Sequence, residues 1–331
     1  KQKKPRTRKP LTANEIIHQR IRAELAQAQN IVITGHIRPD GDAIGSMLGL
    51  AQALREQGKQ VQTVLQDPID PKYSTLIGAD GIKDSIEQAY EYLIVVDSAD
   101  RARVGNVLDD ATIVDLAIDH HISHEDFAEI DFVVANYEAT ALLIYDCLSA
   151  WGLAISKESA ECLMTGILSD TIGFRTSSTT PKSLRAVAEM MALGVSLPDV
   201  YFKTLSSRSI EELRYWGLGL GKLHYEDGIV WTSLDQQDRE TSGFPRYDDA
   251  DLINHLSSMQ GALIAIIFVE QPGGSVKISW RSVPGVDVSR LASKFGGGGH
   301  AAAAGADVPG DLATVMEQVL TKSKSYLANR L

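Results

Sequence analysis

Short apolar runs alternate with helical patterns along the N-terminal two thirds of this 331-residue chain, and no other feature restricts its fold as strongly. The apolar runs of strand length are 31–36, 60–66, 92–97 and 113–119. Apolar residues recur at helical spacing in 13–28, 43–57, 138–151, 157–169, 181–193 and 208–222. Strands that alternate with helices form parallel sheets covered by helices. The sequence therefore predicts an α/β fold whose N-terminal domain has a doubly wound, mostly parallel sheet.

The last third of the chain has a different pattern, in which three predicted strands are surrounded by three predicted helices. Strands are expected at 228–234, 262–271 and 275–282, the last two joined by a Pro-Gly-Gly turn. Helices are expected at 248–259, 288–294 and 310–328. This pattern predicts a smaller α+β domain. The expected organisation is a disordered basic tail (1–12), an N-terminal domain (13–195), a helical linker (196–225) and a C-terminal domain (226–331).

The charge of the chain is unevenly distributed, with a formal total of −11. Residues 1–10 contain six cations and no acid, whereas residues 11–197 contain 27 acidic and 13 basic side chains. A protein that coats long nucleic acid needs a basic face to neutralise phosphates. The acidic balance therefore argues against a stable complex with long nucleic acid. Short anionic substrates bridged by metal ions remain compatible with it.

The two cysteines, Cys147 and Cys162, both lie within predicted helices, so neither a disulfide framework nor a cysteine zinc site is expected. We predict two buried, reduced thiols. No apolar run reaches the length of about 18 residues that a membrane span requires, and no signal peptide is apparent. These features predict a cytoplasmic protein.

Histidine and aspartate side chains are concentrated where predicted strands end. They are His36, Asp40 and Asp42 after the first strand, Asp97 after the third, Asp119, His120 and His121 after the fourth, and Asp170 at the end of helix 157–169. Ligands of open parallel sheets bind outside the carboxyl ends of the strands. We therefore expect these side chains to converge on a metal site, in contrast to His18, His124, His224 and His255, which are predicted to be surface or packing residues.

Carboxylates combined with a few imidazoles favour a divalent ion such as Mn²⁺, with Mg²⁺ or Co²⁺ as alternatives. A carboxylate such as Asp97 can bridge two ions and so support two-metal activation of water. The glycines Gly41, Gly45 and Gly49 recur every four residues. They are predicted to allow close helix–sheet packing rather than to bind a dinucleotide.

These residues resemble the motifs of the DHH phosphoesterases. The first motif is His36-Ile-Arg-Pro-Asp-Gly-Asp-Ala-Ile-Gly-Ser46, and the others are Val-Val-Asp97, Asp119-His-His121 and Ser-Asp170. The C-terminal Phe-Gly-Gly-Gly-Gly-His300 segment, preceded by Arg281-Ser, resembles the DHH-associated domain. Within the family, the chain is most similar to the NrnA-like group of short oligoribonucleases, 3′-phosphoadenosine 5′-phosphate (pAp) phosphatases and cyclic di-AMP-pathway phosphodiesterases.

The resemblance implies a role for each matching residue. Its metal ligands would be His36, Asp40 and Asp97 for one ion, and Asp42, Asp97, His120 and Asp170 for the other. His121 would face the scissile phosphate, and Asp119 would orient the neighbouring imidazoles. Substrate would be bound by His121, Arg281, Ser282, Gly297, Gly298, Gly299 and His300. One departure is the run Ala301–Ala304 after His300, where family members often carry a larger or basic side chain. This leaves the exact substrate open.

The function expected from this resemblance is Mn²⁺-dependent hydrolysis of short oligoribonucleotides, linear pApA and pAp by a two-metal mechanism. Alternatives within the family are a cyclic di-AMP phosphodiesterase, a RecJ-like single-strand DNA exonuclease and an inorganic pyrophosphatase. The non-enzymatic alternative is a nucleotide-sensing module. The resemblance also implies a homodimer, for which helices 138–151 and 157–169 could supply either an interface or core.

Overall fold

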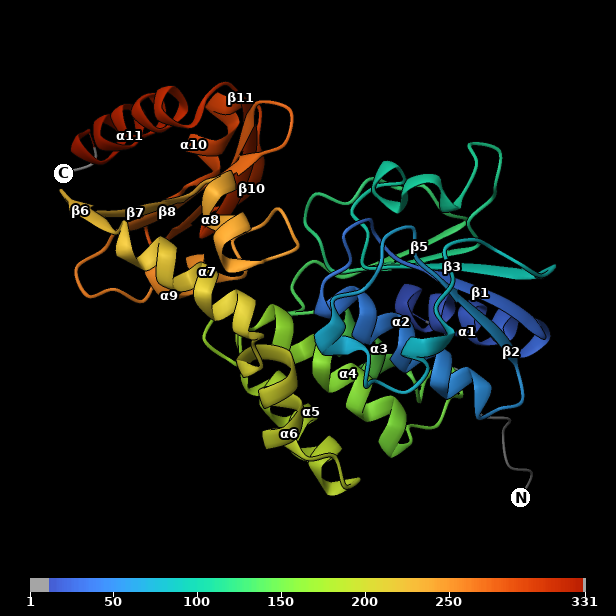
Figure 1. Ribbon diagram of the computed structural model, residues 1–331. Helices are drawn as coiled ribbons and strands as arrows, with labels where there is room; N and C mark the ends of the chain where they lie inside the picture. Colours follow the sequence, from blue (N-terminus) through green and yellow to red (C-terminus); the bar gives the residue numbers. More distant parts are fainter. Residues whose placement is uncertain (1–11, 330–331) are drawn as a thin grey trace, which may run out of the picture. The chain divides into compact units, whose positions relative to one another are not determined.

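The computed structural model describes residues 12–329, so the predicted basic tail lies outside the described residues except for Thr12. The chain forms two compact units with their boundary between Ser207 and Arg208 (Figure 1). This boundary lies inside the predicted helical linker, residues 196–225. Among the described residues, no helix combines the length and the apolar character needed to cross a membrane.

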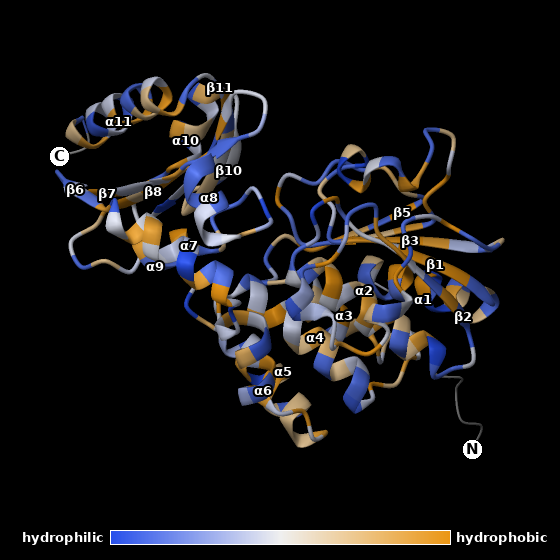
Figure 2. Cartoon of the chain, viewed as in Figure 1, coloured by the Kyte–Doolittle hydropathy of each residue, from blue (hydrophilic) through white to orange (hydrophobic). Residues whose placement is uncertain are grey.

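The first unit is built on a five-stranded parallel sheet with the order β2-β1-β3-β4-β5. Its strands are β1 (Asn30–Thr34), β2 (Gln60–Val64), β3 (Tyr92–Val96), β4 (Leu116–Asp119) and β5 (Ile130–Val133). Figure 2 shows hydrophobic strands in this sheet. Four strands were predicted; β5 was missed because only its alternate residues are buried. The predicted α/β fold with a parallel sheet is confirmed.

The α-helices of this unit cover one face of the sheet, while a 3₁₀ helix and loops cover the other (Figure 1). The helices are α1 (Ala13–Gln27), α2 (Gly41–Arg55), α3 (Thr140–Cys147), α4 (Lys157–Asp170), α5 (Pro181–Ala192) and α6 (Leu197–Tyr201). The 3₁₀ helices are η1 (Pro71–Tyr73), η2 (Ala79–Gly81) and η3 (Ala102–Val107), and η4 (Phe202–Ser206) is a π-helical turn. Helices α3 and α4 are largely buried. They therefore form core and do not present an exposed interface.

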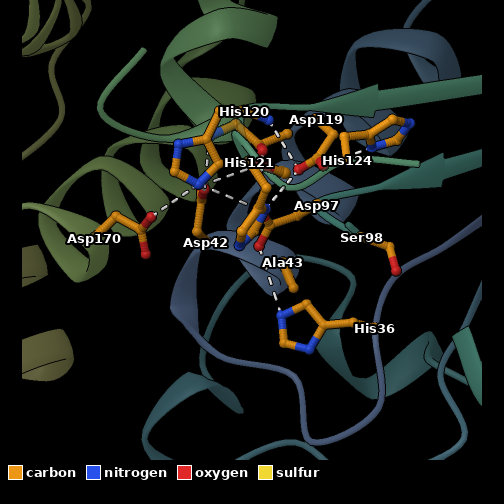
Figure 3. A network of polar contacts seen from close by, with 12 residues as sticks. His36, Asp42, Ala43, Asp97, Ser98, Asp119, His120, His121, His124 and Asp170 are labelled. Carbon is orange, nitrogen blue, oxygen red and sulfur yellow. Dashed lines mark hydrogen bonds and ion pairs between the residues drawn. The ribbon is translucent and has the colours of Figure 1, made fainter. Parts of the chain in front are cut away.

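The glycines of α2 face helix α4, not the sheet as predicted. A Cβ atom added at Gly45 would lie 2.5 Å from the carbonyl oxygen of Cys162, and one added at Gly49 would lie 2.6 Å from Cγ of Leu163. The two helices can approach this closely only because these positions lack side chains. This packing brings the start of α2, with Asp42, next to the end of α4, with Asp170 (Figure 3).

Cys147 and Cys162 are buried free thiols, as predicted. Both lie in the helical core of the first unit. Burial raises the pKa of each thiol to about 12, so neither is a nucleophile at neutral pH.

The second unit contains a six-stranded mixed sheet with the order β10-β11-β9-β8-β7-β6. Its strands are β6 (His224–Glu226), β7 (Ile229–Leu234), β8 (Ile264–Gln271), β9 (Ser275–Ser282), β10 (Gly298–His300) and β11 (Ala303–Pro309). Only β7 and β8 pair in parallel. Its helices are α7 (Ile210–Gly221), α8 (Gln236–Ser242), α9 (Leu252–Leu256), α10 (Ser289–Ala292), η5 (Ser293–Phe295) and α11 (Leu312–Ala328).

The glycine- and alanine-rich segment of the second unit forms strands β10 and β11, where no strand was predicted. A Cβ atom added at Gly297 would lie 2.1 Å from the carbonyl oxygen of Gly305. At Gly299, where φ is 136°, it would lie 2.5 Å from the carbonyl oxygen of Ala303. Small residues are therefore required for the backbones to approach here, which propensity alone does not indicate.

Candidate metal centre

The predicted histidines and aspartates lie together at the carboxyl edge of the first sheet, where β1 and β3 are neighbours (Figure 3). The connections from these two strands diverge, and such a switch point is where parallel sheets bind ligands. His36 follows β1 and Asp97 follows β3. Asp40 caps helix α2, accepting hydrogen bonds from the backbone N–H groups of Asp42 and Ala43 at 2.9 and 3.1 Å.

The carboxylate of Asp97 lies between two sets of possible metal ligands. Its Oδ2 atom is 3.6 Å from Nε2 of His36, and that nitrogen is 3.8 Å from Oδ1 of Asp40. Its Oδ1 atom is 3.7 Å from Nε2 of His120, and that nitrogen is 3.9 Å from Oδ2 of Asp42 and 3.2 Å from Oδ2 of Asp170. Each oxygen of Asp97 thus faces a different set of donors.

The three imidazoles are oriented by acceptors at Nδ1. Nδ1 of His36 is 2.8 Å from the carbonyl oxygen of Ile37, and Nδ1 of His120 is 3.1 Å from that of Tyr137. Nδ1 of His121 is 2.7 Å from Oδ1 of Asp119. Because these oxygens accept hydrogen bonds, Nδ1 of each ring carries a proton, which leaves Nε2 of His36 and His120 as their possible metal-binding atoms. Such contacts are typical of metal-ligating histidines.

Asp42 is fully buried and is held by the N-terminus of helix α3. The backbone N–H groups of Thr140 and Ala141 donate to its two oxygens at 2.6 and 2.9 Å. The hydroxyl of Thr140 also donates to Oδ1 of Asp97, at 2.9 Å. Sequence reasoning did not identify Thr140 as a residue of the site. The available signal was a threonine near the start of a predicted helix.

The electrostatics of the cluster fit a divalent cation. Burial, and then repulsion from Asp97 and Asp170, raise the pKa of Asp42 well above its usual value. Burial alone would lower the pKa of each histidine. For His36, hydrogen bonds with Asp40 and Asp97 outweigh burial and raise the pKa to about 10. For His120, Asp170 and Asp42 raise it to about 11. Bound protons thus offset the negative charge of the clustered carboxylates, and metal ions would displace these protons.

The metal-free protein is expected to lose stability as the pH rises from 6.5 to 9. His36 and His120 bind protons more tightly in the folded chain than in the unfolded chain, so their contribution is complete below pH 6.5 and is lost towards pH 10 to 11. Each additional bound proton changes stability by about 1.4 kcal/mol per pH unit. For a folded unit the size of the first one, each kcal/mol lost from the free energy of unfolding lowers the Tm by about 2–4 °C.

Thermal unfolding in EDTA at pH 6.5, 7.5 and 9 measures this effect. Excess Mn²⁺ should raise the Tm more at pH 9 than at pH 6.5, because protons and metal compete for the same Nε2 atoms. A Tm in EDTA that is constant or rises over this range contradicts the assignment of the bound protons.

His124 was predicted to be a surface or packing residue, but it is part of the polar network around the site. Its side chain is 3 % exposed, and its Nδ1 atom is 2.7 Å from Oδ2 of Asp119 (Figure 3). Burial would raise the pKa of Asp119, but His121 and then His124 lower it to about 2. His124 also contacts Asp131, which lies seven residues later in the sequence. No recognisable motif has this spacing, so the contact could not be predicted.

Comparison with known proteins identifies the family. The model of the DHH family, N-terminal domain, matches residues 30–167, and that of the DHHA1 domain matches residues 248–329. The chain is 33 % identical over 314 residues to the bifunctional oligoribonuclease and PAP phosphatase NrnA of Thermus thermophilus, covering 93 % of this chain and 94 % of that protein. The chain belongs to the DHH family.

Further relatives agree with this assignment. The NrnA protein of Bacillus subtilis, also a bifunctional oligoribonuclease and PAP phosphatase, is 25 % identical, covering 84 % of this chain and 89 % of that protein. The crystal structure of an exopolyphosphatase-related protein from Bacteroides fragilis has a TM-score of 0.84 and 27 % identity, covering 97 % of this chain and all of that chain. As a DHH-family phosphoesterase, the chain is a hydrolase of phosphoric esters with a candidate divalent-metal site.

Apart from His121, the predicted substrate-binding residues lie in the second unit. Arg281 on β9 pairs across the sheet with Ala265 and Ala303, both of which have small side chains. Among the described residues, its guanidinium donates one hydrogen bond, to the carbonyl oxygen of Trp280 at 3.1 Å. Burial lowers the pKa of Arg281, against the opposing effect of Asp249 and Asp251. An arginine has five N–H donors, so most remain available for an anion.

The other predicted substrate-binding residues are placed differently. The hydroxyl of Ser282 donates to the carbonyl oxygens of Val286 and Ala301, at 2.6 and 3.1 Å. This side chain therefore stabilises the backbone of the second unit. Gly298 and His300 are exposed on β10. Gly297 and Gly299 lie against β11, where a side chain would collide with the backbone.

Proposed function

We propose that this protein is an Mn²⁺-dependent phosphodiesterase that hydrolyses short oligoribonucleotides and pAp by a two-metal mechanism. In this proposal, residues 13–195 supply the catalytic site and residues 226–331 bind the terminal nucleotide. The named activities of the relatives from T. thermophilus and B. subtilis support the substrate class. The acidic total charge supports short substrates over long ones.

The observation that carries the two-metal part of this proposal is the position of Asp97. Its two oxygens face separate donor sets, at 3.6 Å from His36 and 3.7 Å from His120. A single-metal site would need only one of these sets. We therefore assign His36, Asp40 and Asp97 to one ion, and Asp42, Asp97, His120 and Asp170 to the other. The donors are carboxylate oxygens and imidazole nitrogens, which suit Mn²⁺.

Bound divalent ions supply Lewis-acid stabilisation of phosphate oxygens and lower the pKa of coordinated water. The protein residues then hold the reacting groups. Nδ1 of His121 donates to Oδ1 of Asp119, and the two atoms are 2.7 Å apart. The ring therefore presents Nε2 to the scissile phosphate, where it binds the phosphate or exchanges a proton with it. Thr140 holds Asp97 and Asp42 in place through its hydroxyl and backbone N–H groups.

Parallel turnover assays test the proposed function. The substrates are pApA, a three-residue RNA, pAp, cyclic di-AMP, pyrophosphate and a single-stranded DNA 24-mer, each with Mn²⁺, Mg²⁺, Co²⁺ or EDTA. We expect hydrolysis of the first three with Mn²⁺ and none in EDTA. Preference for cyclic di-AMP, pyrophosphate or the 24-mer would replace the proposal with the corresponding alternative. Binding without turnover of any substrate would favour a nucleotide-sensing module.

Replacing Arg281 with alanine is expected to raise KM for pApA by about 10-fold or more, because charge-assisted hydrogen bonds contribute about 1.5–3 kcal/mol each. The value of kcat should change less, since the contact is assigned to ground-state binding. Lys277→Ala is the matched control, because Lys277 lies on the same face of β9. A larger fall in kcat than rise in KM would assign Arg281 to the transition state instead.

A further inference from the structure

The ring of His124 is buried between two carboxylates that come from neighbouring strands. Both nitrogens of its buried ring face carboxylates: Nδ1 lies 2.7 Å from Oδ2 of Asp119, and Nε2 lies 3.1 Å from Oδ1 of Asp131. We propose that His124 is a positioning residue that fixes Asp119 and, through Asp119, the ring of His121. This inference rests on the proposed function, in which His121 acts on the phosphate.

Asp119 is the central member of this network. Its Oδ1 atom accepts from Nδ1 of His121 at 2.7 Å and from the backbone N–H of His120 at 2.8 Å. Its Oδ2 atom accepts from His124. The carboxylate is 1 % exposed, so an unpaired Oδ2 could not be compensated by bulk water. Loss of the contact with His124 would favour rotation of the carboxylate, and rotation would move Oδ1 away from His121.

The charges in the network are consistent with this geometry. An ionised carboxylate only accepts hydrogen bonds, so both ring nitrogens of His124 donate and the ring is an imidazolium. Burial alone would lower the pKa of His124, but Asp131 and Asp119 outweigh it and raise the pKa. The positive ring stabilises Asp119 as an anion. An anionic Asp119 in turn requires the proton of His121 to be on Nδ1, which makes Nε2 its basic atom.

Asp131 is held in place by its strand and by backbone hydrogen bonds. Asp131 lies on β5 and pairs in register with Ala117 of β4, two residues before Asp119. Its carboxylate also accepts from the backbone N–H groups of Phe127 and Ala128, at 3.2 and 3.3 Å. The side chains of Asp119 and Asp131 therefore come from adjacent strands of one sheet, on the same face. His124 spans the space between them.

Two substitutions of His124 separate positioning from packing. His124→Asn keeps an N–H donor close to the place of Nδ1 but cannot reach Asp131, whereas His124→Leu keeps a similar volume and has no donor. The leucine variant should lower kcat for pApA by about 10–100-fold, the range observed when outer-sphere partners of metal-site histidines are lost. The asparagine variant should recover most of this loss. KM and Mn²⁺ affinity should stay within about threefold in both, since His124 is assigned to neither substrate nor metal.

A spectroscopic measurement tests the same inference without turnover. In ¹⁵N-histidine NMR of the metal-free full chain, the Nδ1 proton of His121 should give a hydrogen-bonded signal in the wild type and in His124→Asn. The signal should be lost or shifted in His124→Leu. Should the leucine variant fail to fold, Asp131→Asn provides the test, because its oxygen can still accept from Phe127 and Ala128 while the negative charge beside His124 is gone. We expect a smaller fall in kcat and the same direction of NMR change.

A leucine variant that retains both the wild-type kcat and the His121 signal would overturn the inference. A purely structural role for His124 would lower the Tm of both variants and leave kcat per folded molecule unchanged, which would also overturn it. If the wild type hydrolyses none of the nucleotides but the NMR signal responds as expected, the proposed function fails while the positioning of His121 by His124 stands.

Discussion

Replacing Asp97 with asparagine should remove both metal ions and nearly all turnover. The amide retains the shape of the side chain but replaces one ligating oxygen with a nitrogen that cannot bind a metal. Removal of a single oxyanion donor already costs about 10²–10³ in rate, so loss of a bridging ligand should cost about 1,000-fold or more. The readouts are kcat/KM for pApA and the number of Mn²⁺ ions bound per chain.

The backbone at this position makes asparagine a fair substitution. Asp97 has a φ of 55°, in the left-handed region that asparagine tolerates better than most residues. The fold should therefore survive, which the Tm in EDTA can verify. Asp110→Asn, which changes an exposed carboxylate of the same unit, is the matched control and should behave like the wild type. An Asp97→Asn enzyme with wild-type turnover in Mn²⁺ would exclude the two-metal assignment.

Replacing Gly45 with alanine should destabilise the first unit by about 2–3 kcal/mol, because inserting atoms into a packed core typically costs about 1–3 kcal/mol. The new Cβ would lie 2.5 Å from the carbonyl oxygen of Cys162 and 2.7 Å from the backbone nitrogen of Gly166. Both are backbone atoms of α4, so no side chain can rotate away. The helices would have to separate, and Asp42 and Asp170 would separate with them. The Tm should fall by about 4–12 °C, and metal affinity should fall as well.

Gly217→Ala is the control for this experiment. Gly217 also lies in a helix, but a Cβ atom added there would meet nothing within 4 Å. Alanine is favoured over glycine in a helix by up to about 1 kcal/mol, so this variant should be as stable as the wild type or slightly more stable. Equal Tm values for Gly45→Ala and the wild type would show that α2 and α4 do not need this close contact.

Much of the first unit could be predicted because its signals are local. A strand such as β3 is a continuous apolar run of strand length, and the residue that follows it, Asp97, is visible in the sequence itself. The convergence of Asp97 with His36 then follows from a general property of parallel sheets, whose carboxyl ends lie at one edge. The second unit was less predictable. Strands β10 and β11 consist largely of glycine and alanine. Strand β11 forms because β9 offers a partner, and β10 in turn pairs with β11.

Strand length, helical spacing and the residues at strand ends are local properties. The parallel α/β fold and the residues at the carboxyl edge of its sheet could therefore be predicted from the amino-acid order alone. The way in which these residues are held depends on contacts between distant parts of the folded chain. The contact between Thr140 and Asp42 joins residues 98 positions apart, and the α2 glycines depend on the backbone of α4. Likewise, His124 became part of the network only when β4 and β5 brought Asp119 and Asp131 to either side of its ring. Hydrogen bonds depend on distance in space, which local sequence patterns do not encode.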